Sequence, residues 1–150
     1  MFSKSEASRI RSAFWTNFGR YIAPVPSANG YNINWINYRT GVKHIRFTMD
    51  FTSRNAEVWV EFTFTDTNKR AQVFDAFASL WKTTNNDEEW IFINDTVKDE
   101  KQMAAVRSSI ENVNIFQQDT WPDAINFLKK QMLMLDEFWV ENKEMFEMMA

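Results

Sequence analysis

The chain contains two kinds of apolar pattern: stretches in which apolar residues recur every three or four positions, and stretches in which they alternate with polar residues. The first pattern favours helices and the second favours strands. A helix is predicted near the start, where Ser3 and Glu6 form a Ser-x-x-Glu capping box that satisfies free backbone N–H groups. Its apolar stripe reaches Ile22, and the Pro-Val-Pro segment at 24–26 ends it.

Three strands are predicted next. Residues 33–38 and 42–51 form one hairpin, with Gly41 in the left-handed position of a three-residue loop. The second hairpin joins 42–51 to the segment after a turn at Ser53 and Arg54. Its register is fixed because each apolar residue then meets an apolar residue of the other strand. The predicted pairs are Phe51 with Ala56, Met49 with Val58, Phe47 with Val60, and Ile45 with Phe62.

The rest of the chain continues this alternation of patterns. Helices that accompany a mainly antiparallel sheet make an α+β fold. The predicted core order is αβββαβ-like with one further strand, and residues 1–150 form a single domain. The remaining elements are a helix from Asp66 or Thr67, a polar turn over 83–89, a strand at 89–94, a helical turn within 96–106, a strand at 108–116 and a long helix from Thr120 to about residue 148.

Composition narrows the chemistry that this fold can carry. Aromatic residues make up 16% of the chain, which supports a large core because each buried ring removes about 150–250 Å² from water. The chain has no Cys, which excludes disulfides, thiolate zinc sites and cysteine nucleophiles. A single His excludes a two-histidine zinc helix, and the spacing of the three Gly excludes glycine-rich phosphate loops.

The net charge of −3 averages two unequal parts. Residues 1–54 hold eight Lys or Arg against two acids, and residues 55–150 hold nine against eighteen. The basic part can bind nucleic-acid phosphates; alternatively, it faces the acidic part within one fold. No apolar run approaches the roughly 20 residues that span a bilayer, and the start lacks a secretory apolar core. We therefore expect a cytoplasmic protein without membrane contact.

The polar face of the second hairpin is the main candidate for chemistry. Arg46 lies opposite Glu61 as a favourable pair, whereas Asp50 lies opposite Glu57 as a pair of like charges. Carboxylates held together can bind Mg²⁺ or share a proton in acid–base catalysis. Alternatively, they lie at an exposed hairpin end, where water and Arg54 screen their repulsion. Asp50, Glu57 and Glu61 are the candidate catalytic and metal-binding residues, with Mg²⁺ expected only if this face is catalytic.

Two other residues of this face are weighed in the same way. His44 is the only side chain of the kind that gains and loses a proton near neutral pH, which makes it a candidate catalyst. Its alternative is a hydrogen-bonded surface group. Trp59, with Arg46, is a candidate ligand-binding residue, because a ring among charges can stack on a base, a sugar or a ligand ring. Alternatively, the last helix or a loop covers this face and buries Trp59.

The predicted order helix–strand–strand–strand–helix–strand is similar to the core order of the PD-(D/E)xK nucleases. In that family, two acids on consecutive strands hold a metal, and a lysine two residues after the second acid helps to activate water. Asp50 and Glu61 would be the acids here, but Thr63 stands where that lysine would be. The resemblance therefore implies a degenerate or metal-dependent nuclease-like domain as an alternative.

The last predicted helix is apolar on more than one side. One side suits packing against the sheet or the first helix. The other side, with Met145, Phe146 and Met149, suits contact with a second copy of the chain or with a partner protein, because methionine adapts to many surfaces. The alternative is that all of these residues fold into the core of the monomer.

Six stretches together carry a resemblance to a known family: Glu6–Ser8, Ala13–Gly19, Asn34–Val42, Glu88–Trp90, Trp121–Pro122 and Leu135–Trp139. Through them the chain resembles an uncharacterised bacterial family, domain-of-unknown-function family 4268, over almost its whole length. The resemblance implies a bacterial cytoplasmic protein. Members commonly follow a nuclease-like domain in longer proteins, which implies a nuclease-associated role. The family has no established catalytic residues, and so the resemblance assigns no site.

Taken together, the sequence predicts a non-enzymatic accessory or binding module that self-associates, as a homodimer, or binds a partner through its last helix. No cofactor is expected for such a module. The first alternative is the nuclease-like domain. The second is a nucleic-acid-binding domain that uses the basic residues of 1–54 together with Trp59.

Overall fold

The computed structural model describes residues 2–85 and 89–150 of the chain. It confirms the predicted α+β class, the antiparallel sheet and the long C-terminal helix. Within the described residues, the elements in order are α1 (Lys4–Ile22), β1 (Ile45–Phe51), β2 (Asn55–Phe62), α2 (Thr67–Asn85), β3 (Trp90–Lys98), β4 (Lys101–Glu111), the short 3-10 helix η1 (Gln118–Thr120) and α3 (Trp121–Met149).

The helices begin where the sequence signals place them. Ser3 Oγ accepts a hydrogen bond from the backbone N–H of Glu6 at 3.2 Å, which caps α1. Asp66 Oδ1 accepts from the N–H groups two and three residues later, at 2.9 and 3.1 Å, and caps α2. Thr120 directly precedes α3, as predicted. Side-chain caps therefore set the starts of α1 and α2, whereas α3 begins without a side-chain cap and with Pro122 in its first turn.

The four strands form one antiparallel sheet in the order β1-β2-β4-β3. β1 and β2 pair in the predicted register, with Phe47 opposite Val60 and Asp50 opposite Glu57. The apolar residues of this hairpin point to one face and are mostly buried. The opposite face is called the open face below. From β1 and β2 it carries Arg46, Thr48, Asp50, Glu57, Trp59 and Glu61.

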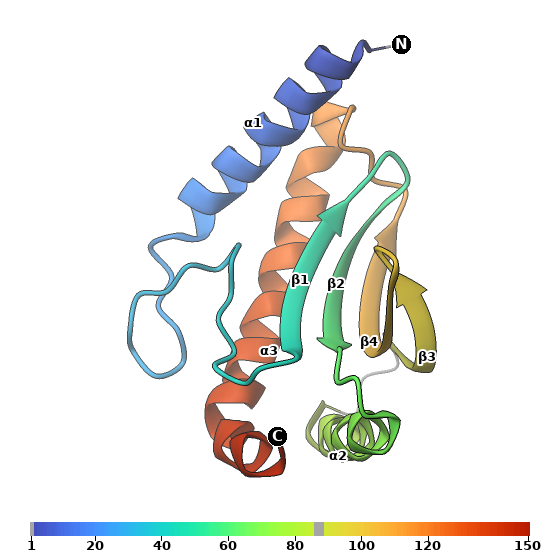
Figure 1. Cartoon of the computed structure of the whole chain (residues 1–150). Coiled ribbons are helices and arrows are strands. Elements are labelled where there is room, and N and C mark those ends of the chain that lie inside the picture. Colours follow the sequence, from blue (N-terminus) through green and yellow to red (C-terminus); the bar gives the residue numbers. More distant parts are fainter. Residues whose placement is uncertain (1, 86–88) are drawn as a thin grey trace.

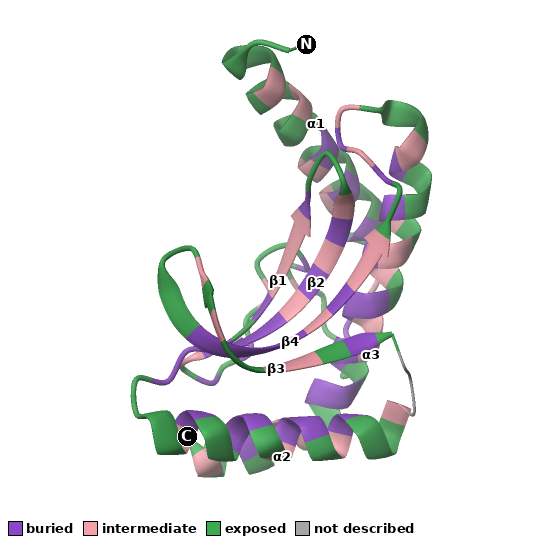
Figure 2. Cartoon of the chain, turned by 90° about the vertical axis from the view of Figure 1, so that its right-hand side faces the viewer, coloured by how far each residue is buried: buried purple, intermediate pink, exposed green. Residues whose placement is uncertain are grey.

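The helices are unevenly distributed around the sheet. α1 and α3 lie on its apolar side, and α2 crosses its lower end (Figure 1). Seen from the side, α3 stands on one side of the curved sheet, and the tip of the β3–β4 hairpin curls away on the other (Figure 2). The core between sheet and helices is rich in aromatic rings. The fully buried ones include Phe14, Phe18, Phe62, Phe77 and Phe146.

The predicted strand at 33–38 is wrong, and so is the hairpin built on it. Residues 23–44 form a long loop between α1 and β1 instead, and this segment is called the long loop below. Side chains satisfy part of its backbone without strand pairing: Asn34 Oδ1 accepts from the N–H of Asn37 at 3.0 Å. Trp35, which the alternating pattern places on a strand, is buried and anchors the loop in the core.

The predicted helical turn within 96–106 is also wrong, and the strand predicted at 108–116 begins too late. β3 and β4 form a hairpin whose turn residues, Asp99 and Glu100, have φ values of 50° and 63°. Positive φ at both central residues is the geometry of a type I′ turn, which Asn-Gly usually marks. An acidic pair is a weak signal for such a turn. Asn112, with φ 63°, directly follows the last residue of β4.

With these corrections, the element order of the described residues is αββαββα. The predicted similarity to the core order of the PD-(D/E)xK nucleases therefore does not hold. The polar turn predicted over 83–89 starts too early because α2 extends to Asn85, and residues 86–88 lie outside the described residues. No helix among residues 2–85 and 89–150 is long and apolar enough to cross a membrane.

Candidate functional site

Two acids of the open face converge on one lysine. Lys98 Nζ lies 2.6 Å from Glu61 Oε2 and 3.4 Å from Asp50 Oδ2, and it donates to Thr48 Oγ1 at 3.2 Å. Thr48 in turn donates to Glu61 Oε2 at 2.9 Å. Glu61 is only 4% exposed, and so these donors replace water around its charge. Lys98 ends β3, and the curl of the β3–β4 hairpin brings it over β1 and β2 (Figure 2).

The third candidate acid has a different partner. Arg107 Nη1, from β4, donates to Glu57 Oε2 at 3.0 Å. The predicted opposition of Asp50 and Glu57 is confirmed in the register, and each of these like charges has its own cation, which relieves their repulsion. Sequence reasoning missed both cations, because a helical turn within 96–106 cannot place Lys98 on the sheet and the strand predicted at 108–116 begins after Arg107.

The candidate acids are therefore divided between two ion-pair groups and do not form one cluster. Lys98 Nζ joins Asp50 and Glu61, whereas Glu57 belongs to the pair with Arg107. In the part of the chain that the structure describes, no group of three or more acidic or histidine side chains is placed to hold a metal ion. The predicted three-acid site is corrected accordingly.

The open face is hollowed beside β1. A pocket of about 310 Å³ is lined by Arg46, Thr48, Asp50, Glu61 and Lys98, together with residues of the long loop. α3 lies on the opposite side of the sheet, and so the last helix does not cover this face (Figure 2). Arg46 is exposed and forms no ion pair with any described residue, although its Cα lies opposite that of Glu61. We call this pocket the polar pocket.

Trp59 and His44, the remaining candidates for ligand binding and catalysis on this face, have surroundings that do not favour these roles. Two cations lie over the Trp59 ring, Lys98 Nζ at 4.5 Å and the Arg107 guanidinium at 5.6 Å from its centroid. They occupy positions that a stacking base would need. His44 precedes β1 with φ 73°, and its Nδ1 lies 3.5 Å from Thr63 Oγ1. Among the described residues, no carboxylate lies within ion-pair distance of the His44 ring.

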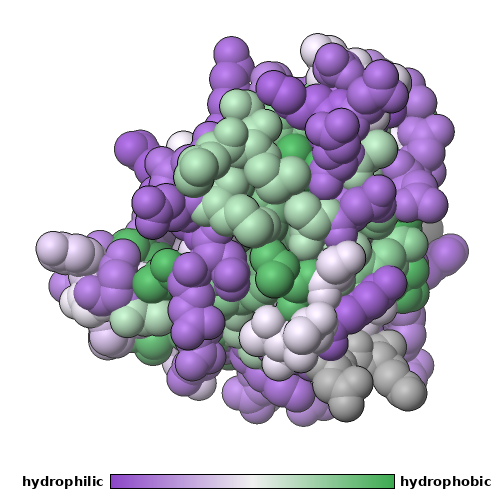
Figure 3. All heavy atoms as spheres, turned by 90° about the horizontal axis from the view of Figure 1, so that it is seen from below, coloured by the Kyte–Doolittle hydropathy of each residue, from purple (hydrophilic) through white to green (hydrophobic). Residues whose placement is uncertain are grey.

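The C-terminal end of α3 presents the methionines predicted for an interface. Met145 is 38% exposed, Met148 is 83% exposed and Met149 is half-buried. We call these three residues the methionine end. The prediction for Phe146 is corrected, because its ring is fully buried in the core. Met148 is the most exposed of the group. The end of α3 lies at the lower end of the molecule, where apolar side chains gather among hydrophilic ones (Figures 1 and 3).

A buried acid of α3 holds the long loop against the helix. Asp136 is 2% exposed. Its Oδ1 accepts from Ser27 Oγ at 2.8 Å and Tyr38 Oη at 2.6 Å, and its Oδ2 accepts from the N–H of Ala28 at 2.7 Å. Burial, the hydrogen bond to Asp136 and the charge of Asp136 raise the pKa of Tyr38 above its usual range. Sequence reasoning missed this network because its partners lie about a hundred residues apart.

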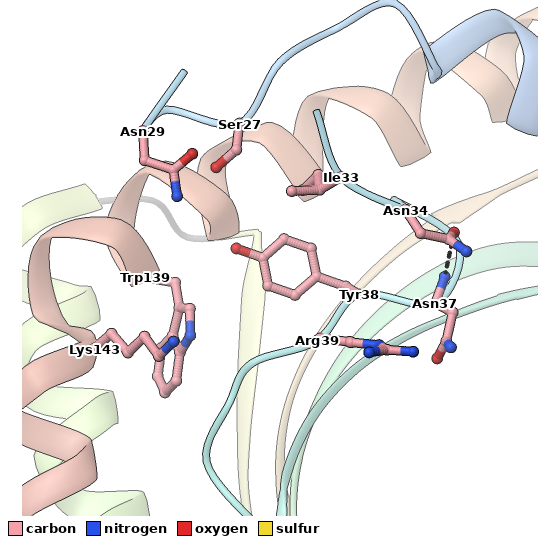
Figure 4. A pocket seen from close by; sticks show the side chains of 9 residues that line it. All are labelled: Ser27, Asn29, Ile33, Asn34, Asn37, Tyr38, Arg39, Trp139 and Lys143. Atoms are coloured by element: carbon pink, nitrogen blue, oxygen red, sulfur yellow. Dashed lines mark hydrogen bonds between the residues drawn. The ribbon is translucent and has the colours of Figure 1, made fainter. Parts of the chain in front are cut away.

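This network forms the rear of a second pocket. Its volume is about 370 Å³, and it lies between the long loop and α3. Figure 4 shows the Tyr38 ring at its centre, Trp139 and Lys143 of α3 on one side, and Arg39 below the ring. We call it the loop pocket. The full lining is Ser27, Asn29, Ile33, Asn34, Asn37, Tyr38, Arg39, Trp139 and Lys143.

With the geometry described, the chain can be compared with known proteins. A family model described as a domain of unknown function, DUF4268, matches residues 10–143. The chain belongs to this family. No curated protein and no solved structure matches the chain.

The DUF4268 match agrees with the sequence resemblance over most of the chain. Two stretches that carry this resemblance, Asn34–Val42 and Leu135–Trp139, meet at the loop pocket, where Tyr38 of one bonds Asp136 of the other. The stretch Glu6–Ser8 lies outside the matched residues. Membership of DUF4268 assigns a family and leaves the function to be argued from the structure.

Proposed function

We propose that the chain is a non-catalytic binding module that self-associates through the methionine end of α3. The observation that carries this proposal is the exposure of Met145 and Met148 at the end of a helix whose other apolar side chains are largely buried. Exposed apolar side chains that gather in one place are typical of interaction surfaces. Methionine suits such surfaces because its unbranched thioether adapts to the partner.

The packing of α3 supports this assignment. Phe146 lies between the exposed methionines in sequence and is fully buried, with its ring centroid 5.3 Å from that of Trp139. Phe146 therefore fixes the last turns of α3 to the core, and the helix presents Met145 and Met148 on a rigid support. A rigid apolar surface loses little conformational entropy when it binds.

The charges around the methionine end predict how association responds to salt. Glu141, Glu144 and Glu147 are exposed beside the methionines. In a two-fold pair, the same surface meets itself, and so these acids are brought together. Salt screens their repulsion and also strengthens apolar burial. We expect self-association to strengthen as salt concentration rises, whereas binding to a basic partner would weaken.

The test is sedimentation equilibrium of the full chain and of a variant with Met145→Gln and Met148→Gln. The wild type is expected to associate at concentrations of about 10–100 μM, with a weight-average mass above the 17.8 kDa of one chain, and the variant to stay monomeric. Val97→Gln is the matched control, because Val97 is 68% exposed at the β3–β4 tip, away from α3. Equal masses for the wild type and the methionine variant would overturn the proposal.

A metal-dependent nuclease-like function remains a second candidate, because the polar pocket brings Lys98 to Asp50 and Glu61. Lys98 comes from β3 and lies within ion-pair distance of both acids. Two carboxylates can bind Mg²⁺. This candidate predicts Mg²⁺-dependent cleavage of plasmid DNA that is lost in Asp50→Asn. The proposed binding function predicts no cleavage by either protein.

A further inference from the structure

The loop pocket is built before any ligand arrives. Asp136 fixes Ser27, Ala28 and Tyr38 of the long loop through three hydrogen bonds of 2.6–2.8 Å. Farther along the loop, Trp139 Nε1 donates to the backbone carbonyl of Thr40 at 2.8 Å. These contacts hold both ends of the pocket-forming segment against one helix. A pocket with fixed walls binds a ligand with a small entropic cost.

Two of the three asparagines that line the loop pocket, Asn29 and Asn34, have amides oriented by the loop itself. Asn29 Oδ1 accepts from the backbone N–H of Tyr31 at 3.0 Å, and Asn34 Oδ1 accepts from that of Asn37 at 3.0 Å. A backbone N–H requires an oxygen acceptor, and so both amides are oriented by the loop. The NH₂ groups of Asn29 and Asn34 are thereby directed away from these turns and remain available as donors.

Two cations complete this donor set. Arg39 and Lys143 line the loop pocket, and neither forms an ion pair with any described residue. The Lys143 side chain lies against the backbone of Gly41, whose φ is 77°; a Cβ at Gly41 would lie 2.6 Å from Lys143 Nζ. Gly41 therefore makes room for this cation beside the pocket. Among residues 2–85 and 89–150, no acidic side chain lines the pocket, and the Asp136 oxygens behind it already accept three hydrogen bonds.

We infer that the loop pocket binds a small organic anion. Its phosphate or carboxylate group is held by Arg39 and Lys143, which are suited to charge-assisted hydrogen bonds with such oxygens. The apolar part of the ligand lies against Ile33 and Tyr38, the apolar lining of the long loop. The volume of about 370 Å³ lies within the range of roughly 300–1,000 Å³ that is usual for small-molecule sites.

Isothermal titration of the full chain with three probes tests this inference. The probes are adenosine monophosphate, benzoate and inorganic phosphate. We expect adenosine monophosphate or benzoate to bind more tightly than inorganic phosphate, because only these two carry a flat apolar part. Arg39→Gln and Lys143→Met are each expected to weaken binding by about tenfold, the loss of one charge-assisted contact. Arg54→Gln is the matched control, because Arg54 is exposed on the β1–β2 turn, away from this pocket.

Two outcomes would overturn the inference. One is the absence of binding by all three probes up to about 10 mM. The other is an equal loss of affinity in Arg54→Gln and Arg39→Gln, which would show attraction by overall charge alone. Sedimentation of the Arg39→Gln variant keeps this test separate from the proposed self-association, because Arg39 does not belong to the methionine end. A chain that binds the probes but stays monomeric supports the pocket and contradicts self-association.

Discussion

Lys98 is the residue on which the polar pocket depends. Its ammonium group is shared by Asp50 and Glu61 and lies over the Trp59 ring. Removing this cation leaves Glu61 as a buried charge with only Thr48 as a hydrogen-bond donor. An uncompensated buried charge costs far more than an exposed ion pair contributes. Lys98, which lies at the end of β3, therefore stabilises the charges that β1 and β2 place on the open face.

We predict that Lys98→Met lowers the free energy of unfolding by about 3 kcal/mol. Combining it with Glu61→Gln is expected to restore part of this loss, because the double variant no longer buries a lone charge. Urea unfolding monitored by tryptophan fluorescence measures both. Lys101→Met is the matched control, since Lys101 is exposed and lies opposite Lys98 in the hairpin. A Lys98→Met variant as stable as Lys101→Met would contradict the role assigned to Lys98.

Tyr38 makes the stability of the folded protein depend on pH under alkaline conditions. The pKa of Tyr38 is raised in the folded state by burial and by Asp136. The pKa of a tyrosine side chain in the unfolded chain is about 10. When the pKa is higher in the folded state, the group stabilises the fold fully below that value, and this contribution is lost as pH rises above it. We therefore expect stability to fall above about pH 10, because the unfolded chain releases a proton that the folded chain keeps.

The comparison with Tyr38→Phe isolates this effect. At neutral pH the variant is expected to be less stable by about 2 kcal/mol, the value of a hydrogen bond to a buried carboxylate. Above about pH 10 the difference should narrow by up to about 1.4 kcal/mol per pH unit, because only the wild type loses the contribution of the phenol. Denaturant unfolding from about pH 8 to about pH 11 measures it. A constant or widening difference would contradict the assignment.

At the scale of elements, the β3–β4 hairpin supplies the two cations of the open face that could not be predicted from the sequence. Its turn places Asp99 and Glu100 at φ values of 50° and 63°, a region that aspartate tolerates and in which glutamate is strained. The hairpin nonetheless carries Lys98 and Arg107 to the acids of β1 and β2. These ion pairs link the far hairpin of the sheet to the acids of β1 and β2.

We predict that replacing the turn with Asn-Gly, through Asp99→Asn and Glu100→Gly, raises the free energy of unfolding by about 1 kcal/mol. The matched control is the same dipeptide at Ser53 and Arg54, whose φ values are not positive. There, glycine relieves no strain and adds freedom to the unfolded chain, and so stability is expected to fall by up to about 1 kcal/mol. Equal effects at both turns would show that backbone strain is not the cause.

The elements also show what could be predicted from the sequence. The register of β1 and β2 follows from alternation, because apolar residues such as Phe47 and Val60 face one another in only one pairing. The long loop could not be predicted, because its aromatic side chains are fixed by bonds that strand pairing does not supply. Tyr38 donates to Asp136 on α3, and the Trp35 indole donates to the backbone carbonyl of Val25. Long-range side-chain pairs of this kind leave no local pattern. The acids of the polar pocket were predicted, and their cation Lys98 was not.

At the scale of the whole molecule, the polar pocket and the loop pocket are neighbours that share Asn37 and Tyr38 of the long loop. The polar pocket also includes residues of β1, β2 and the β3–β4 hairpin, whereas the loop pocket includes Trp139 and Lys143 of α3. The methionine end lies at the lower end of the molecule, where α3 ends (Figure 1). Nucleic-acid binding by the basic residues of 1–54 stays a prediction.

The mass of the unmodified full chain in solution tests the central claim most directly. Sedimentation equilibrium over a concentration series is expected to show a weight-average mass that rises from 17.8 kDa toward twice that value, and to rise further at high salt. A mass of 17.8 kDa at every concentration up to about 1 mM, at low and high salt alike, would contradict self-association through the methionine end.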